Sequence, residues 1–127
     1  MAGKYIIKVV SQFSAAHVLH GYDGPCSRLH GHNWQVEAEV VATKLNNAGI
    51  AIDFKVIRRA LKQIIDRVDH QFLNEIPPFT EINPTAENVA AWFYQEIGPL
   101  LNSDDIRVIA INLWETDNAR VRYTEET

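Results

Sequence analysis

Two segments near the N-terminus have hydrophobic patterns that predict β-strands. Residues 5–13 are rich in Ile, Val and aromatic side chains. Residues 33–43 alternate between polar and apolar side chains, which is typical of a strand buried on one face. The apolar positions of this second segment are Trp34, Val36, Ala38 and Val40. A long loop over residues 15–31 is expected between the two strands, and loops of that length are usually functional or disordered.

The middle of the chain changes to a helical period. Asp53 is a suitable N-cap for a first helix, whose apolar face is Ile57, Ala60, Leu61, Ile64, Ile65 and Val68. A second helix is expected from Ala86, capped by Thr85, with an apolar face at Val89, Ala90, Phe93, Ile97 and Leu100 or Leu101. Residues 69–84, which include three prolines, are predicted to form an irregular connection.

Two further strands, over residues 106–115 and 120–123, are predicted to form a hairpin around residues 116–118. The order ββααββ favours an α+β fold in which two helices cover one face of a four-stranded antiparallel sheet. The length of 127 residues, without repeats or linkers, predicts a single domain over residues 1–127. The two exposed edges of such a sheet favour pairing between subunits, and therefore a homo-oligomer.

Composition and charge narrow the classes of function. The chain is 46% hydrophobic and 22% charged, which is typical of a globular protein. The net charge of −4 without basic clusters argues against a nucleic-acid partner, and no apolar run is long enough for a membrane helix. The N-terminal segment is interpreted as a strand and not as a signal peptide. A single cysteine excludes internal disulfides and multi-cysteine metal sites, and it favours a reducing, cytoplasmic location.

The segment His30-Gly31-His32 is the sharpest local signal of chemistry. Two histidines two residues apart on an extended chain project to the same side, and they share that side with Trp34. They either hold a metal ion or are loop histidines that hydrogen-bond to the backbone. His17 follows the first strand, and antiparallel pairing would bring it close to the other two. Three neutral imidazoles with an open fourth position are typical of a catalytic zinc site.

Other residues are candidates with less specific signals. Cys26, in a Gly- and Pro-rich loop, is interpreted as a metal ligand, a nucleophile, a general base or a small hydrophobic residue. His20 is a further possible ligand, although a solvated loop histidine is the simpler interpretation. Asp69 and His70 close the predicted first helix, where they form either an acid–base pair or a structural C-cap. Glu115, at a strand end, either binds a donor pair such as an amidine or is solvated.

Taken together, these segments resemble the family of 6-pyruvoyl- and 6-carboxy-tetrahydropterin synthases. The resemblance runs along the chain in six segments, FSAAH, CSRLHGHNW, IAIDF, VDHQFLN, NPTAENVA and WET. It implies the T-fold, whose order is ββααββ, and subunits that form barrels stacked as homohexamers with active sites at subunit interfaces.

The resemblance also implies roles for individual residues. The zinc ligands of the family match His17, His30 and His32, and its catalytic residues match Cys26, Asp69 and His70. The carboxylate that holds the pterin ring matches Glu115, and Thr85 matches a residue near the pterin pocket.

The three residues between Cys26 and His30 resemble the spacing of the carboxy branch, which serves the queuosine pathway. That branch implies conversion of 7,8-dihydroneopterin triphosphate to 6-carboxy-tetrahydropterin, acetaldehyde and triphosphate. The alternatives are a 6-pyruvoyl-tetrahydropterin synthase, which stops after triphosphate loss, and a zinc- and pterin-binding protein without catalysis. An unrelated metal sensor is a weaker alternative.

Overall fold

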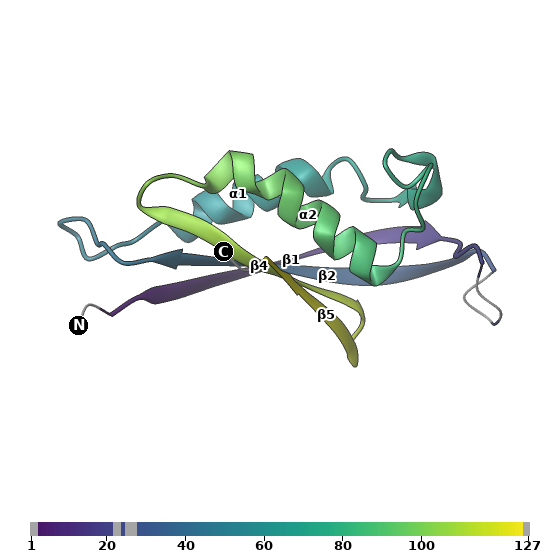
Figure 1. The fold of residues 1–127 in the computed structure, drawn as a ribbon, viewed down its shortest axis with the longest axis horizontal. Coiled ribbons are helices and arrows are strands. Elements are labelled where there is room, and N and C mark those ends of the chain that lie inside the picture. Colours follow the sequence, from purple (N-terminus) through teal and green to yellow (C-terminus); the bar gives the residue numbers. More distant parts are fainter. Residues whose placement is uncertain (1–2, 22–23, 25–27, 126–127) are drawn as a thin grey trace.

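Two helices cover one face of a twisted five-stranded sheet (Figure 1). The structure is a computed structural model that describes residues 3–21, 24 and 28–125. The sheet order is β3-β1-β2-β4-β5. The strands are β1 (Tyr5–His17), β2 (His30–Ala42), β3 (Gln71–Phe72), β4 (Ile106–Thr116) and β5 (Ala119–Thr124). The two α-helices are α1 (Phe54–Ile65) and α2 (Ala86–Leu101), and a single turn of 3-10 helix, η2 (Leu73–Glu75), lies between them in the chain.

The α+β class is confirmed, but the prediction of a four-stranded, fully antiparallel sheet was wrong. A fifth strand, β3, pairs in parallel with the end of β1, Ala15 opposite Gln71 and Ala16 opposite Phe72. Two residues are too few to show an alternating pattern, and the segment lies inside the proline-containing connection. The sheet is therefore mixed.

The first two strands are longer than the sequence pattern indicated. They pair antiparallel over 13 residues, from Tyr5 opposite Ala42 to His17 opposite His30. The predicted loop over residues 15–31 is therefore too long at both ends, because small and histidine residues gave no apolar alternation there. All three candidate metal-binding histidines lie on strands instead of in a loop.

Both predicted helix caps are present. The carboxylate of Asp53 accepts a hydrogen bond from the Lys55 N–H at 2.8 Å, and the Thr85 hydroxyl accepts one from the Asn88 N–H at 3.1 Å. Helix α1 ends at Ile65, before the predicted end near Val68. Val68 is nevertheless buried, because the turns that follow the helix continue to pack on the core.

The core lies between the helices and one face of the sheet. Its largest fully buried side chains come from both layers, and the Phe13 and Trp34 rings stack at a centroid distance of 5.8 Å. The opposite face carries a buried carboxylate, Glu39, which Arg122 binds through two hydrogen bonds of 2.9 and 3.1 Å. Asn112 also donates to Glu39, so every oxygen of this buried group has a partner.

Candidate metal centre

Three imidazoles and one carboxylate converge at one end of the sheet. The β1–β2 register places His17 opposite His30, and His32 opposite Ala15. The period of two puts these rings on the helix-covered face, in line with Trp34. Glu115 follows Trp114, the partner of Gln35, and so reaches the same face from β4. One ligand atom from each of the four side chains lies within 4.8 Å of the others.

Backbone carbonyls fix two of the rings. The Nδ1 atom of His17 lies 2.7 Å from the carbonyl oxygen of Pro84, and that of His30 lies 2.7 Å from the carbonyl oxygen of Arg28. A carbonyl only accepts, so each Nδ1 carries the proton and each Nε2 keeps its lone pair. Such a hydrogen bond behind a histidine is the usual support of a metal ligand.

Buried polar atoms show where a ligand is needed. Among the described residues, the buried polar or charged ones are His17, Glu39 and Asn112. The side chains of Glu39 and Asn112 hydrogen-bond to each other, whereas the Nε2 atom of His17 has no hydrogen-bond partner. An unpaired buried polar atom costs on the order of 1–3 kcal/mol. A cation that accepts the lone pair of His17 removes that cost.

His32 has the same unpaired Nε2 atom. It lies 3.2 Å from Oε1 of Glu115, yet this close contact lacks the alignment of a hydrogen bond. We interpret it as two ligand atoms that approach a common point, because both residues belong to the four-residue group. Three imidazole nitrogens and a carboxylate oxygen are a donor set that suits zinc and other divalent transition metals. The residues present therefore fit a metal ion.

The buried Trp34 ring packs against two histidines of the cluster. The Trp34 ring stands edge-to-face with His17 and His32, at centroid distances of 5.1 and 5.4 Å. Its indole N–H donates to the carbonyl of Ala15 at 3.2 Å, which fixes the ring.

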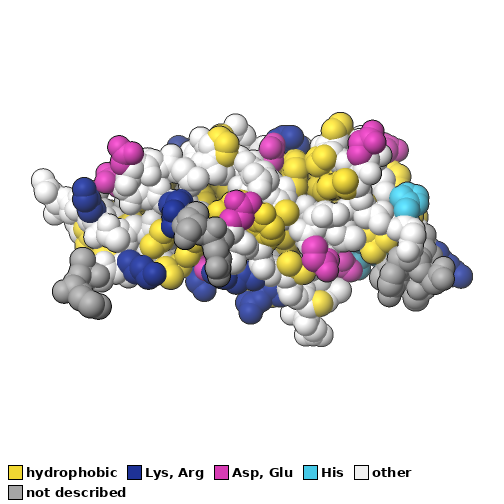
Figure 2. Space-filling model, viewed as in Figure 1, with side chains coloured by type: hydrophobic (Ala, Val, Ile, Leu, Met, Phe, Trp, Pro, Cys, Tyr) yellow, Lys and Arg dark blue, Asp and Glu magenta, His cyan; other side chains and the backbone are white. Residues whose placement is uncertain are grey.

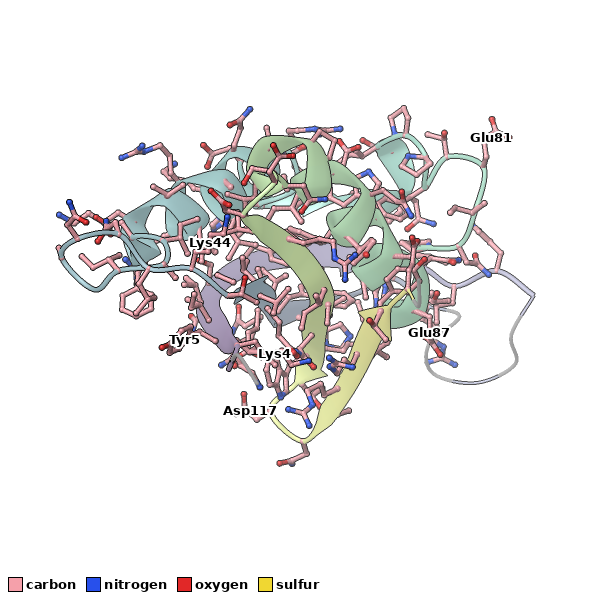
Figure 3. All side chains as sticks on the ribbon, turned by 60° about the vertical axis from the view of Figure 1, so that its left-hand side comes forward. Lys4, Tyr5, Lys44, Glu81, Glu87 and Asp117 are labelled. Atoms are coloured by element: carbon pink, nitrogen blue, oxygen red, sulfur yellow. The ribbon has the colours of Figure 1, made fainter. Side chains whose placement is uncertain are left out.

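Figure 2 shows a histidine side chain at the surface only at the right-hand end of the molecule in this view. Tyr5 and Lys44, labelled in Figure 3, mark the opposite end of the long strands.

Burial lowers the pKa of His17 below 6.5, and desolvation is the main cause. The unfolded chain then binds more protons than the folded chain at a pH just below 6.5. The free energy of unfolding of the metal-free protein is therefore expected to fall as the pH is lowered below about 6.5. Denaturant unfolding between pH 7.5 and 5.5 measures this effect.

The variant His17→Gln is expected to show a weaker pH dependence of stability, with His20→Gln as the control, since His20 is exposed. Equal pH dependence in His17→Gln and in the unaltered protein would contradict a buried neutral imidazole at His17.

Asp69 and His70 form a second polar unit beside β1. Nδ1 of His70 lies 3.0 Å from Oδ1 of Asp69, which also accepts the Ser14 N–H at 2.9 Å. The hydrogen bond from Ser14 is the main reason why the pKa of Asp69 lies below its ordinary value of 3.8. The two side chains are thus in contact, and their role as an acid–base pair stays a prediction.

The backbone around His70 differs from the prediction. Helix α1 ends at Ile65 and its C-cap is Asp66, so Asp69 and His70 do not close the helix, and the alternative of a structural C-cap was wrong. His70 instead adopts φ = 60°, a left-handed conformation that non-glycine residues rarely use, while its N–H donates to the Ser14 carbonyl at 2.6 Å. Strained, exposed residues of this kind cluster at functional sites.

A cavity of about 530 Å³ connects the two units. His32 and His70 both line it, from β2 and from the segment before β3. The remaining lining residues are Ser14, Ala15, Ala16, Gly31, Asn33, Gln71 and Phe72. One histidine of the four-residue group and the histidine of the Asp69–His70 unit therefore line the same open cavity.

The other predicted site residues have different positions. Cys26 lies outside the described residues. Thr85 caps α2 next to Pro84, whose carbonyl holds His17. His20 is exposed and is not part of the four-residue group. The carbonyls of Pro84 and Arg28 were missed, because main-chain acceptors leave no signal in the sequence.

Comparison with known proteins identifies the family. The profile of 6-pyruvoyl tetrahydropterin synthase matches residues 6–126. The chain belongs to the 6-pyruvoyl tetrahydropterin synthase family. A putative 6-carboxy-5,6,7,8-tetrahydropterin synthase of Archaeoglobus fulgidus is 35% identical over 109 residues, which cover 85% of this chain and 90% of that protein. A 6-carboxy-5,6,7,8-tetrahydropterin synthase of Rickettsia typhi is 33% identical over 127 residues, covering 86% and 92%.

Solved structures of the 6-pyruvoyl tetrahydropterin synthase family share the fold. The enzyme of Caenorhabditis elegans superposes with a TM-score of 0.87 at 22% identity, covering 98% of both chains. A Plasmodium vivax 6-pyruvoyltetrahydropterin synthase gives a TM-score of 0.79 at 14% identity, covering 98% of this chain and 99% of that one. These similarities confirm the T-fold expected from the sequence. Within the described part of the chain, neither length nor apolar character allows any helix to cross a bilayer.

Proposed function

We propose that the protein is a zinc-dependent 6-carboxy-tetrahydropterin synthase of the queuosine pathway. The substrate is 7,8-dihydroneopterin triphosphate, which with one water gives 6-carboxy-5,6,7,8-tetrahydropterin, acetaldehyde and triphosphate. The reaction class is carbon–carbon lyase. The observation that carries the proposal is the pair of buried, unpaired Nε2 atoms on His17 and His32. They require a ligand, and His32 lines the same cavity as His70, the partner of Asp69.

The ligands of the metal are His17, His30 and His32, and zinc bound there would supply Lewis acidity to the side-chain hydroxyls of the substrate. Trp34 and the carbonyls of Pro84 and Arg28 hold the rings in place. The chain therefore presents a preorganised set of nitrogen ligands, which reduces the reorganisation needed during the reaction.

Proton transfer is assigned to His70 and Cys26. His70, oriented by the Asp69 carboxylate, donates and accepts protons at the substrate side chain. Cys26, as a thiolate, removes a carbon-bound proton, a role that rests on its match to the catalytic cysteine of the family.

Glu115 and Thr85 complete the proposed site. The family resemblance assigns Glu115 to the amino-pyrimidine edge of the pterin. Its carboxylate also lies 3.2 Å from Nε2 of His32, beside the proposed metal ligands. Thr85 lies near the pterin, at the first turn of α2.

Two observations support the carboxy branch. The relatives at 33% and 35% identity bear the carboxy name, and Cys26 precedes His30 with three residues between them. The 6-pyruvoyl reaction is the second candidate, because the matching family profile bears that name.

A product assay tests the proposal. Zinc-loaded protein is incubated with 7,8-dihydroneopterin triphosphate, and 6-carboxy-tetrahydropterin and trapped acetaldehyde are measured by mass spectrometry. Both products are expected, and Cys26→Ala is expected to lower their formation by at least about 100-fold while zinc remains bound. Triphosphate release with a pyruvoyl product would support the second candidate. Absence of turnover with bound zinc and pterin would contradict both and leave a binding protein.

The assembly is proposed to be a homohexamer of two stacked barrels in the cytoplasm. Across the described residues, β5 pairs on one side only, and β1 pairs with β3 only through Ala15 and Ala16. These free edges support pairing between subunits. Light scattering on the purified protein measures the mass of the assembly.

A further inference from the structure

Two asparagine side chains bind the backbone of the segment that directly follows His17. The last β1–β2 pair is His17 with His30. Beyond it, the N–H of Val18 donates to Oδ1 of Asn74 at 2.9 Å, and Nδ2 of Asn74 donates back to the Val18 carbonyl at 3.0 Å. Asn83 binds His20 in the same way, accepting at 2.9 Å and donating at 2.6 Å.

The side-chain amides replace a neighbouring strand at this position. In an extended chain, alternate residues point their N–H and C=O groups to the same side. Val18 and His20 are such alternate residues, and each meets one primary amide with one donor and one acceptor. Asparagine offers both groups at the spacing of a peptide group, whereas aspartate offers only acceptors. The pair of amides therefore continues the hydrogen-bond ladder of β1 for residues that β3 no longer reaches.

One of these asparagines is directly joined to the support of His17. Asn83 precedes Pro84, whose carbonyl accepts the proton of His17 Nδ1. The Asn83 carbonyl in turn accepts Nδ2 of Asn88 at 2.9 Å, in the first turn of α2. The backbone after His17 and the acceptor of the His17 ring are thus held by the same short segment.

We propose that Asn74 and Asn83 are positioning residues of the metal centre. They fix the His17 ring relative to the Pro84 carbonyl, and thereby direct its Nε2 lone pair to the point that His30 and His32 also face. The inference rests on the proposed metal site at the three histidines. Residues that orient metal ligands typically change metal affinity by 10–100-fold when they are replaced.

The test measures metal binding to purified protein rather than activity alone. Zinc affinity is determined by competition with a chelator, and the absorption spectrum of the cobalt(II)-substituted protein reports the geometry of the ligands. Asn83→Ala and Asn74→Ala are expected to weaken zinc binding by about 10-fold or more and to change the cobalt spectrum.

Asn102→Ala is the matched control for loss of an asparagine hydrogen bond. The side chain of Asn102 accepts the Val108 N–H at 2.8 Å, at the opposite end of α2 from Asn83. This variant is expected to lower stability without changing zinc affinity or the cobalt spectrum. A purely structural role of Asn83 would make the two variants behave alike.

The variant Asn83→Asp distinguishes a loss of positioning from an effect of charge on zinc binding. It also distinguishes a loss of positioning from a failure to fold. It keeps the acceptor for the His20 N–H but places a second oxygen against the His20 carbonyl. The added negative charge favours a nearby cation. Weaker zinc binding in this folded variant therefore supports positioning, and unchanged or tighter binding overturns it.

Zinc binding by His17→Ala distinguishes a failure of the inference from a failure of the proposed metal site. If the unaltered protein binds zinc and His17→Ala does not, while both alanine variants of the asparagines bind normally, only the inference is overturned. If the unaltered protein and His17→Ala bind zinc equally, the proposed metal site is overturned together with the inference.

Discussion

Replacement of His30 by alanine is expected to weaken zinc binding by at least about 100-fold and to lower product formation in parallel. The fold is expected to tolerate this change, because His30 is partly exposed and its backbone stays paired with β1. Its loss leaves two imidazoles, and Glu115 cannot restore a three-nitrogen site. Metal content after dialysis and the rate of product formation measure the effect.

His20→Ala is the matched control for the loss of a histidine. It removes an exposed imidazole near the same end of the molecule, while its backbone hydrogen bonds to Asn83 remain. Zinc binding and turnover are expected to stay unchanged. An equal loss in both variants would show that His30 is not specifically a ligand.

Replacement of His70 by asparagine is expected to lower turnover by about 10²–10⁴-fold, the usual contribution of general acid–base catalysis. Zinc affinity should not change, because His70 is not part of the four-residue group. Asparagine tolerates the left-handed backbone better than histidine does, so the loss of the contact with Asp69 is offset. The free energy of unfolding is therefore expected to change by less than about 1 kcal/mol.

Turnover, zinc affinity and denaturant unfolding of His70→Asn together decide its role. Loss of zinc along with activity would place His70 among the metal ligands. Full activity would exclude it as the acid or base. His70→Ala provides the comparison, since alanine lacks the tolerance of asparagine for φ = 60° and should be less stable.

The sequence contained enough information for the main layers of the fold. Alternation around Trp34 identified β2 and its buried face, and Asp53 and Thr85 identified the starts of both helices. β3 could not be predicted, because its two residues become a strand only through pairing with β1. The full length of β1 also depends on a partner, since Ala15 and Ala16 have little strand preference of their own.

The candidate site was partly predictable for a similar reason. The two-residue spacing of His30 and His32 gives a shared face, and antiparallel pairing brings in His17. The contact of Glu115 with His32 depends on β4 lying next to β2, a neighbour relation that local patterns do not contain. The supporting carbonyl of Pro84 lies 67 residues from His17 in the chain and offers no side chain to recognise.

The register of β1 and β2 has a consequence for the order of folding. His17, His30 and His32 belong to one antiparallel pair, so a single loop closure brings the three imidazoles together. Closing such a short loop costs little chain entropy compared with bringing Glu115 to the same point. The three imidazoles therefore form a local unit, and the Glu115 carboxylate joins it only when the C-terminal hairpin has docked. During synthesis, that local unit leaves the ribosome before β4 has been made.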